Sequence, residues 1–199
     1  MKNKPIIIIN GEPNSIFLEI FFKSLKYKKY KSPLILISSL KLLKLQMEKL
    51  KFKMNIKLID YKNINKYKFN NNYINLINIK YNPKKAFENI SNKSNSYIKK
   101  SFDKALEIIK LDVSNKLING PISKKYFLNK KYLGITEYIS DNFNKKNTCM
   151  LIFNKKLSVC PITTHLPLSM VAKKINKKVI MNKIILIQNF YKKYLNKKP

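Results

Sequence analysis

Short apolar runs alternate with helical patterns in the first half of this chain, and this alternation restricts its fold more than any other feature. The run from Pro5 to Ile9 is β-branched and leads into Asn10-Gly11, which is typical of a buried strand followed by a loop. After a helix cap expected at Asn14-Ser15, apolar side chains recur at helical spacing as far as Leu25. Further strands are expected at Pro33 to Ser38 and Met54 to Ile59, with a helix at Leu40 to Leu50 between them. Alternation of this kind predicts an α/β fold.

The middle of the chain contains one strong helical pattern and one segment that is harder to assign. Apolar side chains from Ser96 to Leu111 gather on one helical face, and this helix leads to a strand at Lys116 to Ile118. Between Asn63 and Asn82 the chain is rich in Asn, Tyr and Lys, which favours a surface excursion, with one strand expected at Ile74 to Ile79.

The last part of the chain predicts a change in the sheet and a return to helix. Cys149 to Phe153 and Leu157 to Ile162 are apolar segments joined by a polar turn, as in a β-hairpin, so we expect a mixed, mostly parallel sheet. Beyond Pro167 the pattern is helical, with an apolar stripe from Val179 to Tyr194. There is no internal repeat and no Gly/Ser linker, so residues 1–199 are expected to form one compact unit.

The charge of the chain is extreme but its chemistry is uniform. The formal net charge is +32, and all 42 basic residues are Lys. Nucleic-acid recognition relies heavily on the planar, bidentate guanidinium of Arg, which this chain lacks. We therefore interpret the charge as a solvated Lys-rich surface and do not expect a nucleic-acid partner.

Cysteine and hydropathy patterns indicate where the protein works. Cys149 and Cys160 are the only cysteines and have no metal-type spacing, and no charged segment leads into an apolar signal core. The apolar runs are far too short to cross a bilayer, so we expect no membrane association and a cytoplasmic location.

Four rare residues are candidates for function. Gly11, Gly120 and Gly134 are the only glycines, and each lies in a loop beside an expected strand or helix. They can permit close approach of a ligand or simply form tight turns, and their spacing does not decide between these roles. His165 is the single histidine, and one imidazole cannot form a metal site by itself.

Three separated segments carry a more specific signal. The first is Gly11-Glu12-Pro13, which follows the opening strand, and the second is Asn119-Gly120-Pro121-Ile122 together with Gly134-Ile135-Thr136-Glu137. The third is Thr163-Thr164-His165-Leu166-Pro167-Leu168. In order and spacing, these segments resemble motifs of the 4-hydroxythreonine-4-phosphate dehydrogenase family. The third matches that family's Thr-Thr-His-Leu-Pro-Leu motif, whereas Ile135 stands where the family's Gly-His-Thr-Glu motif has His.

The resemblance implies a fold and an activity. The fold would be a three-layer α/β/α arrangement like that of isocitrate and isopropylmalate dehydrogenases, incomplete at the C-terminus. The activity would be oxidation of 4-phosphooxy-L-threonine by NAD or NADP, assisted by a divalent metal (Zn, Mg or Co) and followed by decarboxylation, in pyridoxal phosphate synthesis. His165 would be a metal ligand and Thr136 a substrate-binding residue, in a homodimer that takes a phosphorylated small molecule.

The same resemblance raises the question of completeness. Family members continue past the point where this chain stops, and the chain offers one His where the family uses three. We therefore expect that a separate polypeptide completes the site, or that the chain is an inactive relic or a binding protein of the same fold. A phosphorylated threonate is an alternative substrate.

Overall fold

The computed structural model describes residues 4–128, 131–132, 134–144 and 147–199. The chain divides into two compact units, Met1–Asn129 and Lys130–Pro199, and each is described by itself. The expectation of a single domain over residues 1–199 stays a prediction.

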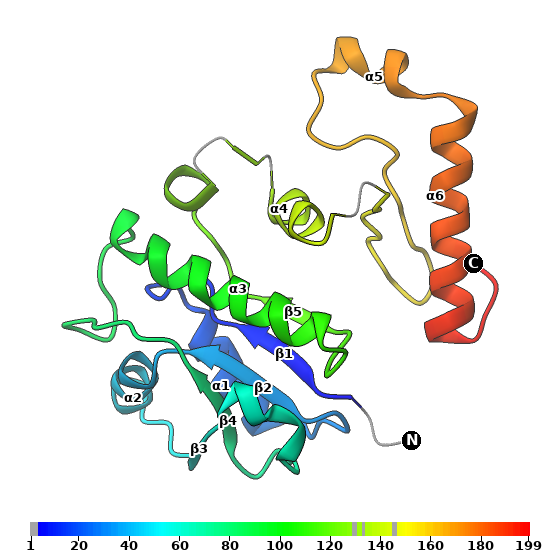
Figure 1. Ribbon diagram of the computed structural model, residues 1–199. Helices are drawn as coiled ribbons and strands as arrows, with labels where there is room; N and C mark the ends of the chain where they lie inside the picture. Colours follow the sequence, from blue (N-terminus) through cyan, green and yellow to red (C-terminus); the bar gives the residue numbers. More distant parts are fainter. Residues whose placement is uncertain (1–3, 129–130, 133, 145–146) are drawn as a thin grey trace. The chain divides into compact units, whose positions relative to one another are not determined.

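The first unit is built on a parallel sheet of five strands (Figure 1). In chain order these are β1 (Ile6–Ile9), β2 (Leu34–Ser38), β3 (Ile56–Leu58), β4 (Ile74–Asn78) and β5 (Leu117–Asn119). Their spatial order is β3-β4-β2-β1-β5, and every neighbouring pair is parallel. Parallel sheets are covered on both faces, which explains why β2 reads as the uninterrupted apolar run Leu-Ile-Leu-Ile before Ser38.

Helices cover the two faces of this sheet and make three layers. The helices are α1 (Phe17–Tyr27), α2 (Leu40–Lys49) and α3 (Asn95–Lys110), with short helical turns at η1 (Tyr61–Lys66), η2 (Asn92–Ser94) and η3 (Lys124–Leu128). Phe22 of α1 and Leu42 of α2 pack in one buried cluster with Ile8 and Leu36. On the other side α3, which buries Phe102 completely, lies against β1 and β2 (Figure 1). The three-layer α/β prediction is confirmed.

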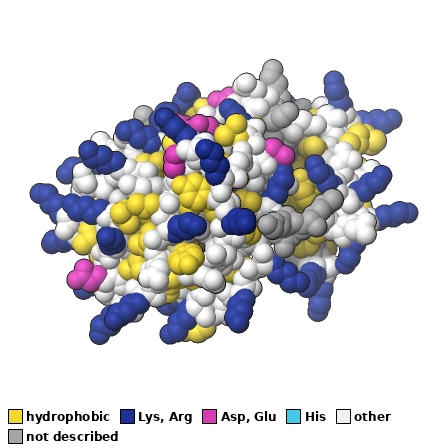
Figure 2. Space-filling view, turned by 60° about the horizontal axis from the view of Figure 1, so that its bottom comes forward, with side chains coloured by type: hydrophobic (Ala, Val, Ile, Leu, Met, Phe, Trp, Pro, Cys, Tyr) yellow, Lys and Arg dark blue, Asp and Glu magenta, His cyan; other side chains and the backbone are white. Residues whose placement is uncertain are grey.

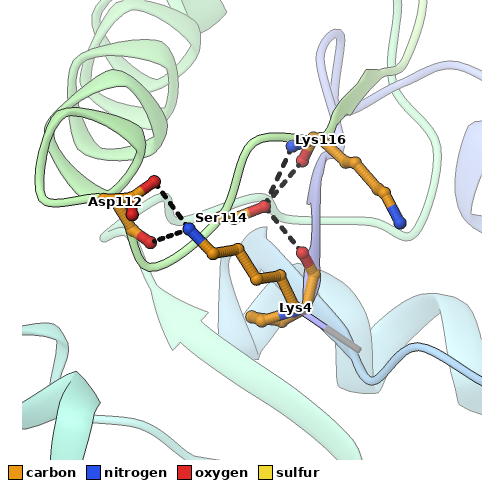
Figure 3. A network of polar contacts seen from close by, with 5 residues as sticks. Lys4, Asp112, Ser114 and Lys116 are labelled. Atoms are coloured by element: carbon orange, nitrogen blue, oxygen red, sulfur yellow. Dashed lines mark hydrogen bonds and ion pairs between the residues drawn. The ribbon is translucent and has the colours of Figure 1, made fainter. Parts of the chain in front are cut away.

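A polar network joins the amino ends of β1 and β5 (Figure 3). Lys4 Nζ lies 2.6 Å from the Asp112 carboxylate and donates to the Asp112 carbonyl oxygen at 2.8 Å. Ser114 Oγ donates to the Pro5 carbonyl at 2.6 Å and accepts from the Lys116 backbone N–H at 3.1 Å. These contacts fix the chain from the end of α3 to the start of β5, and they hold the amino end of β5 beside that of β1.

In the Asn-rich segment from Asn63 to Asn82 the strand expected at Ile74 to Ile79 is confirmed, and the segment is more than the expected surface excursion. It contains β4, which lies between β3 and β2 with Leu76 fully buried. Asn71 bonds both ways, accepting from Leu34 N at 2.9 Å and donating to the carbonyls of Tyr30 and Ser32. Asn75 is 1% exposed and donates to the Leu34 carbonyl. The polar composition misled because these Asn side chains satisfy backbone groups inside the fold.

The second unit is mainly helical. It contains α4 (Ile135–Asn142), α5 (Leu168–Lys174) and α6 (Lys177–Phe190), and α6 continues into a π-helical turn, η4 (Tyr191–Leu195). The helical prediction beyond Pro167 is confirmed. Among the residues described, α6 has no buried side chain, and Ile184, Ile185 and Phe190 are exposed on it.

The mixed sheet was a wrong prediction, because the expected hairpin adds no strand to the five-stranded sheet. Its two arms form one antiparallel bridge, between Ile152 and Val159. The turn between them is closed by side chains, since Ser158 Oγ donates to the Asn154 carbonyl and accepts from its N–H. Both bridge residues are more than half exposed, and no third strand pairs with the arms within the described residues, so two short arms gain little from a longer ladder.

The distribution of Lys side chains agrees with the interpretation of the net charge as a solvated Lys-rich surface. Figure 2 shows Lys side chains spread over the visible face with few acidic ones among them, rather than gathered in one stripe. No helix within the described residues is long and apolar enough to cross a membrane.

Candidate functional site

Polar side chains meet at the carboxyl ends of the parallel strands, where open α/β sheets usually bind ligands. Ser38 ends β2 and its hydroxyl lies 3.1 Å from Tyr97 Oη of α3. Asn10 follows β1 and donates to the same Tyr97 oxygen at 3.4 Å. Because all three side chains are almost completely buried and bond to one another, this group holds α3 to the sheet.

Glu12 lies in the same region and is 2% exposed. Its Oε2 accepts from Ser94 Oγ at 2.9 Å, and its Oε1 accepts from the Asn14 backbone N–H at 3.3 Å. Burial raises the pKa of the Glu12 carboxyl, and the hydrogen bonds from Ser94 and Asn14 oppose that rise. Glu12 therefore links the loop after β1 to the start of α3.

Gly11 and Gly120 are required by the close contact of two backbones. Gly11 has φ +72°, and a Cβ there would lie 2.4 Å from the Pro121 carbonyl oxygen. A Cβ on Gly120 would lie 2.0 Å from the Asn10 carbonyl oxygen. The Glu12 N–H also donates to the Pro121 carbonyl at 2.8 Å. At these two positions the missing side chain makes room for protein backbone and not for a ligand, so close packing of the two loops is the role that the structure shows.

Thr136 lies in the first turn of α4, beside a pocket of about 540 Å³ in the second unit. The pocket is lined by a cation and several hydroxyl and carboxylate groups: Lys131, Tyr132, Thr136, Glu137, Ser140, Asp141, Asn144 and Thr148. Tyr132 Oη donates to the Asp141 carboxylate at 2.6 Å, and this bond raises the pKa of the Tyr132 phenol. The Lys131 ammonium and the Thr136 hydroxyl can each donate to an anionic small molecule, and the carboxylates of Glu137 and Asp141 add negative charge to the same pocket.

His165 is exposed and lies near the start of the same helix. Its backbone has φ +56°, a left-handed conformation that is uncommon for residues other than glycine. A Cβ on Gly134 would lie 3.7 Å from His165 Nε2 and 2.9 Å from Glu137 Oε2. Gly134, Glu137 and the His165 imidazole are thus neighbours, at one end of the helix that carries Thr136.

Glu137 is the functional candidate that sequence reasoning did not single out. Its Oε2 is buried and has no hydrogen-bond partner among the described residues. Glu137 lies three positions after Gly134, the residue that precedes α4. An acidic side chain at this spacing commonly folds back over the start of its helix, so the spacing could have identified Glu137 from the sequence.

The metal expected from the resemblance can be tested against these donors. The imidazole nitrogen of His165 and the unpaired oxygen of Glu137 are both good ligands for a divalent cation, so the donor chemistry fits. Within the part of the chain that the structure describes, no three His, Cys, Asp or Glu side chains gather as a metal site. Any cation held here would need further ligands from water, substrate or another chain.

Comparison with known proteins decides the family. The model of the family described as pyridoxal phosphate biosynthetic protein PdxA matches residues 29–199. The chain belongs to the PdxA family. A 4-hydroxythreonine-4-phosphate dehydrogenase from Sulfurihydrogenibium sp. is 31% identical over 190 residues, covering 94% of this chain and 58% of the relative. The enzyme of that name from Campylobacter jejuni is also 31% identical, covering 95% of this chain and 55% of its own length.

Solved structures in the PdxA family share the fold. A proposed 4-hydroxythreonine-4-phosphate dehydrogenase from Salmonella typhimurium superposes with a TM-score of 0.82 at 21% identity, over 97% of this chain and 61% of that chain. The corresponding protein from Burkholderia phymatum gives a TM-score of 0.79 at 20% identity, over 94% of this chain and 59% of that one. The chain therefore spans well under two thirds of the length of these relatives.

Proposed function

We propose that this chain takes part in the oxidation of 4-phosphooxy-L-threonine by NAD or NADP, followed by decarboxylation to 3-amino-2-oxopropyl phosphate, in the cytoplasmic synthesis of pyridoxal phosphate. Membership of the PdxA family supports the pathway, and the names of the relatives support the substrate. The observation that carries the proposal is the position of His165, whose imidazole lies beside Gly134 at the start of the helix bearing Thr136.

The residues of this chain would bind and orient the substrate. Thr136 would donate its hydroxyl hydrogen to a phosphate oxygen, and the backbone N–H groups at the start of α4 would favour the same negative charge. Lys131 lines the pocket and adds a positive charge. His165 would hold a divalent cation (Zn²⁺, Mg²⁺ or Co²⁺) through a ring nitrogen. When bound, that cation supplies positive charge that stabilises negative charge developing on substrate oxygen.

The direct test is formation of NADH or NADPH from 4-phosphooxy-L-threonine, with a divalent cation present, by the purified chain mixed with a separate chain that supplies the remaining part of a longer relative. We expect turnover that His165→Ala abolishes and that Thr136→Ala reduces by raising KM for the phosphorylated substrate. Rescue of vitamin B6-independent growth in a bacterium lacking this dehydrogenase would provide a second readout. Failure of both assays, even with the remaining part of a longer relative supplied as a separate chain, would contradict the proposal.

A catalytically silent binding protein of the same fold is the second candidate. It is favoured by one observation, the lack of a three-residue cluster of metal-binding side chains in the described part of the chain. This candidate requires that substrate binds with equal affinity in the presence and absence of a divalent cation, whereas the dehydrogenase proposal requires that the cation tightens binding. Isothermal titration with the substrate measures the difference.

A homodimer is the expected assembly, and the exposed apolar face of α6 supports it. Met181, Ile184 and Ile185 lie on one side of α6 and are each more than a third exposed. Exposed apolar groups of this size commonly mark protein interfaces. Sedimentation equilibrium should give twice the chain mass, and Ile184→Lys with Ile185→Lys should shift the protein to monomer.

A further inference from the structure

The Glu137 carboxylate has a buried oxygen that lacks a hydrogen-bond partner among the described residues, unlike the carboxylates of Glu12 and Asp141. Its Oε2 is shielded from solvent and accepts no hydrogen bond from any described residue. By contrast, Asp141 on the same helix accepts from Tyr132, and Glu12 accepts from Ser94 and Asn14. A buried carboxylate oxygen without a partner costs free energy. We therefore expect Glu137 Oε2 to bind a partner that the described residues do not supply, such as an ion.

The surroundings of Glu137 identify the class of that partner. His165 Nε2 and Glu137 Oε2 both lie within 4 Å of the position that a Cβ on Gly134 would occupy. Gly134 has an extended backbone with φ −161°, which any residue can adopt. Glycine matters at this position because its missing side chain leaves space beside Glu137 and His165. The left-handed backbone of His165 is a strained conformation of the kind that gathers at ligand sites.

We propose that Glu137 is a second protein ligand of the divalent cation, binding through Oε2 beside His165 Nε2. This inference rests on the proposed function, in which His165 is a metal ligand. An imidazole and a carboxylate are a common pair in catalytic divalent-metal sites, where open positions are filled by water or substrate. Water or substrate could reach a cation held here from the His165 side, because that residue is exposed.

The test is a titration of the purified chain with Co²⁺, followed by the visible absorption of the bound ion. The unmodified chain should show one saturable site, and Glu137→Gln should weaken it by at least about tenfold, the lower end of what even indirect partners of metal ligands contribute. Asp103→Asn is the control, because that carboxylate lies on α3, is already paired with Lys99 and does not line the pocket beside Thr136, and it should leave the affinity unchanged. Gly134→Ala should weaken binding while leaving the chain folded, since the added Cβ meets only side-chain ends.

His165→Ala separates this inference from the function on which it rests. If His165→Ala abolishes Co²⁺ binding while Glu137→Gln binds like the unmodified chain, the role of Glu137 is overturned and the assignment of His165 stands. If neither substitution changes binding, or if the unmodified chain shows no saturable site, both are overturned. In thermal melting without metal, Glu137→Gln should be at least as stable as the unmodified chain, because the unpaired buried charge is removed, and this excludes misfolding as the cause of weak binding.

Discussion

At the scale of single residues, Glu12 is the clearest source of pH dependence in the fold. Burial raises its pKa above the ordinary value of 4.5, so the folded state holds the Glu12 proton more tightly than the unfolded state does. Its contribution to stability is therefore fully present below the unfolded pKa and is lost as pH rises through the folded pKa. We expect Glu12→Gln to remove this loss, because Gln Nε2 can donate to Ser94 Oγ while Ser94 donates to the Ser91 carbonyl.

Urea unfolding of both proteins between about pH 4 and pH 8 measures this effect. The free energy of unfolding of the unmodified chain should fall, relative to that of Glu12→Gln, as pH rises. A constant difference across the range would show that Glu12 does not titrate as described.

Two glycines offer a matched pair of substitutions. Gly120→Ala places a Cβ 2.0 Å from a backbone oxygen, whereas Gly134→Ala meets only the flexible ends of Glu137 and His165. We expect Gly120→Ala to lower the free energy of unfolding by at least about 2 kcal/mol and Gly134→Ala to change it by less than about 1 kcal/mol. Equal losses in denaturant titrations would contradict the packing of the two loops.

Individual site residues were predictable only where a motif contained them. His165 and Thr136 were proposed from short motifs, and their roles in metal and substrate binding stay predictions. Glu137 was missed as a candidate because its distinguishing feature, a buried oxygen without a partner, depends on the fold. The packing of Gly11 against Pro121 was equally unpredictable, because the two residues are far apart in the sequence and meet only through the pairing of β1 with β5.

At the scale of elements, the start of α2 depends on one side chain. Ser39 is 1% exposed, and its hydroxyl accepts from the Leu42 N–H at 3.3 Å and donates to the Tyr81 carbonyl at 2.9 Å. We expect Ser39→Ala to cost about 1–2 kcal/mol of the free energy of unfolding, because it removes a helix cap and a buried bond.

The control for Ser39→Ala is Asn176→Ala, which removes the exposed cap of α6. It should cost about 0.5–1 kcal/mol in the same urea titration, since no second bond is lost. A larger loss for Asn176→Ala than for Ser39→Ala would be inconsistent with the double role of Ser39.

Elements were predicted well where their pattern was local. All five strands of the sheet lie within or beside the runs expected from the sequence, because β-branched residues between loop signals mark buried strands. The strand order β3-β4-β2-β1-β5 was not predictable, since it depends on which faces the helices cover. The expected hairpin forms only one antiparallel bridge and does not extend the sheet, because an apolar pattern shows that a segment can pair but not which strand lies beside it.

At the scale of the whole molecule, a net charge of +32 should make stability depend on salt. The four ion pairs found among the described residues contribute little each, so self-repulsion between Lys side chains dominates. We expect Tm to rise between about 0.01 M and about 0.15 M sodium chloride, where the Debye length shortens from about 30 to 8 Å. A fall in Tm over this range would mean that ion pairs dominate.

The assignment of His165 as a metal ligand is tested most directly by zinc-edge anomalous diffraction from crystals of the chain grown with Zn²⁺. The expected result is one strong peak about 2.0–2.1 Å from His165 Nε2, with Glu137 Oε2 at a similar distance from it. Strong zinc peaks only at other residues, with the His165 imidazole bound to no ion, would contradict the metal-dependent dehydrogenase proposed here.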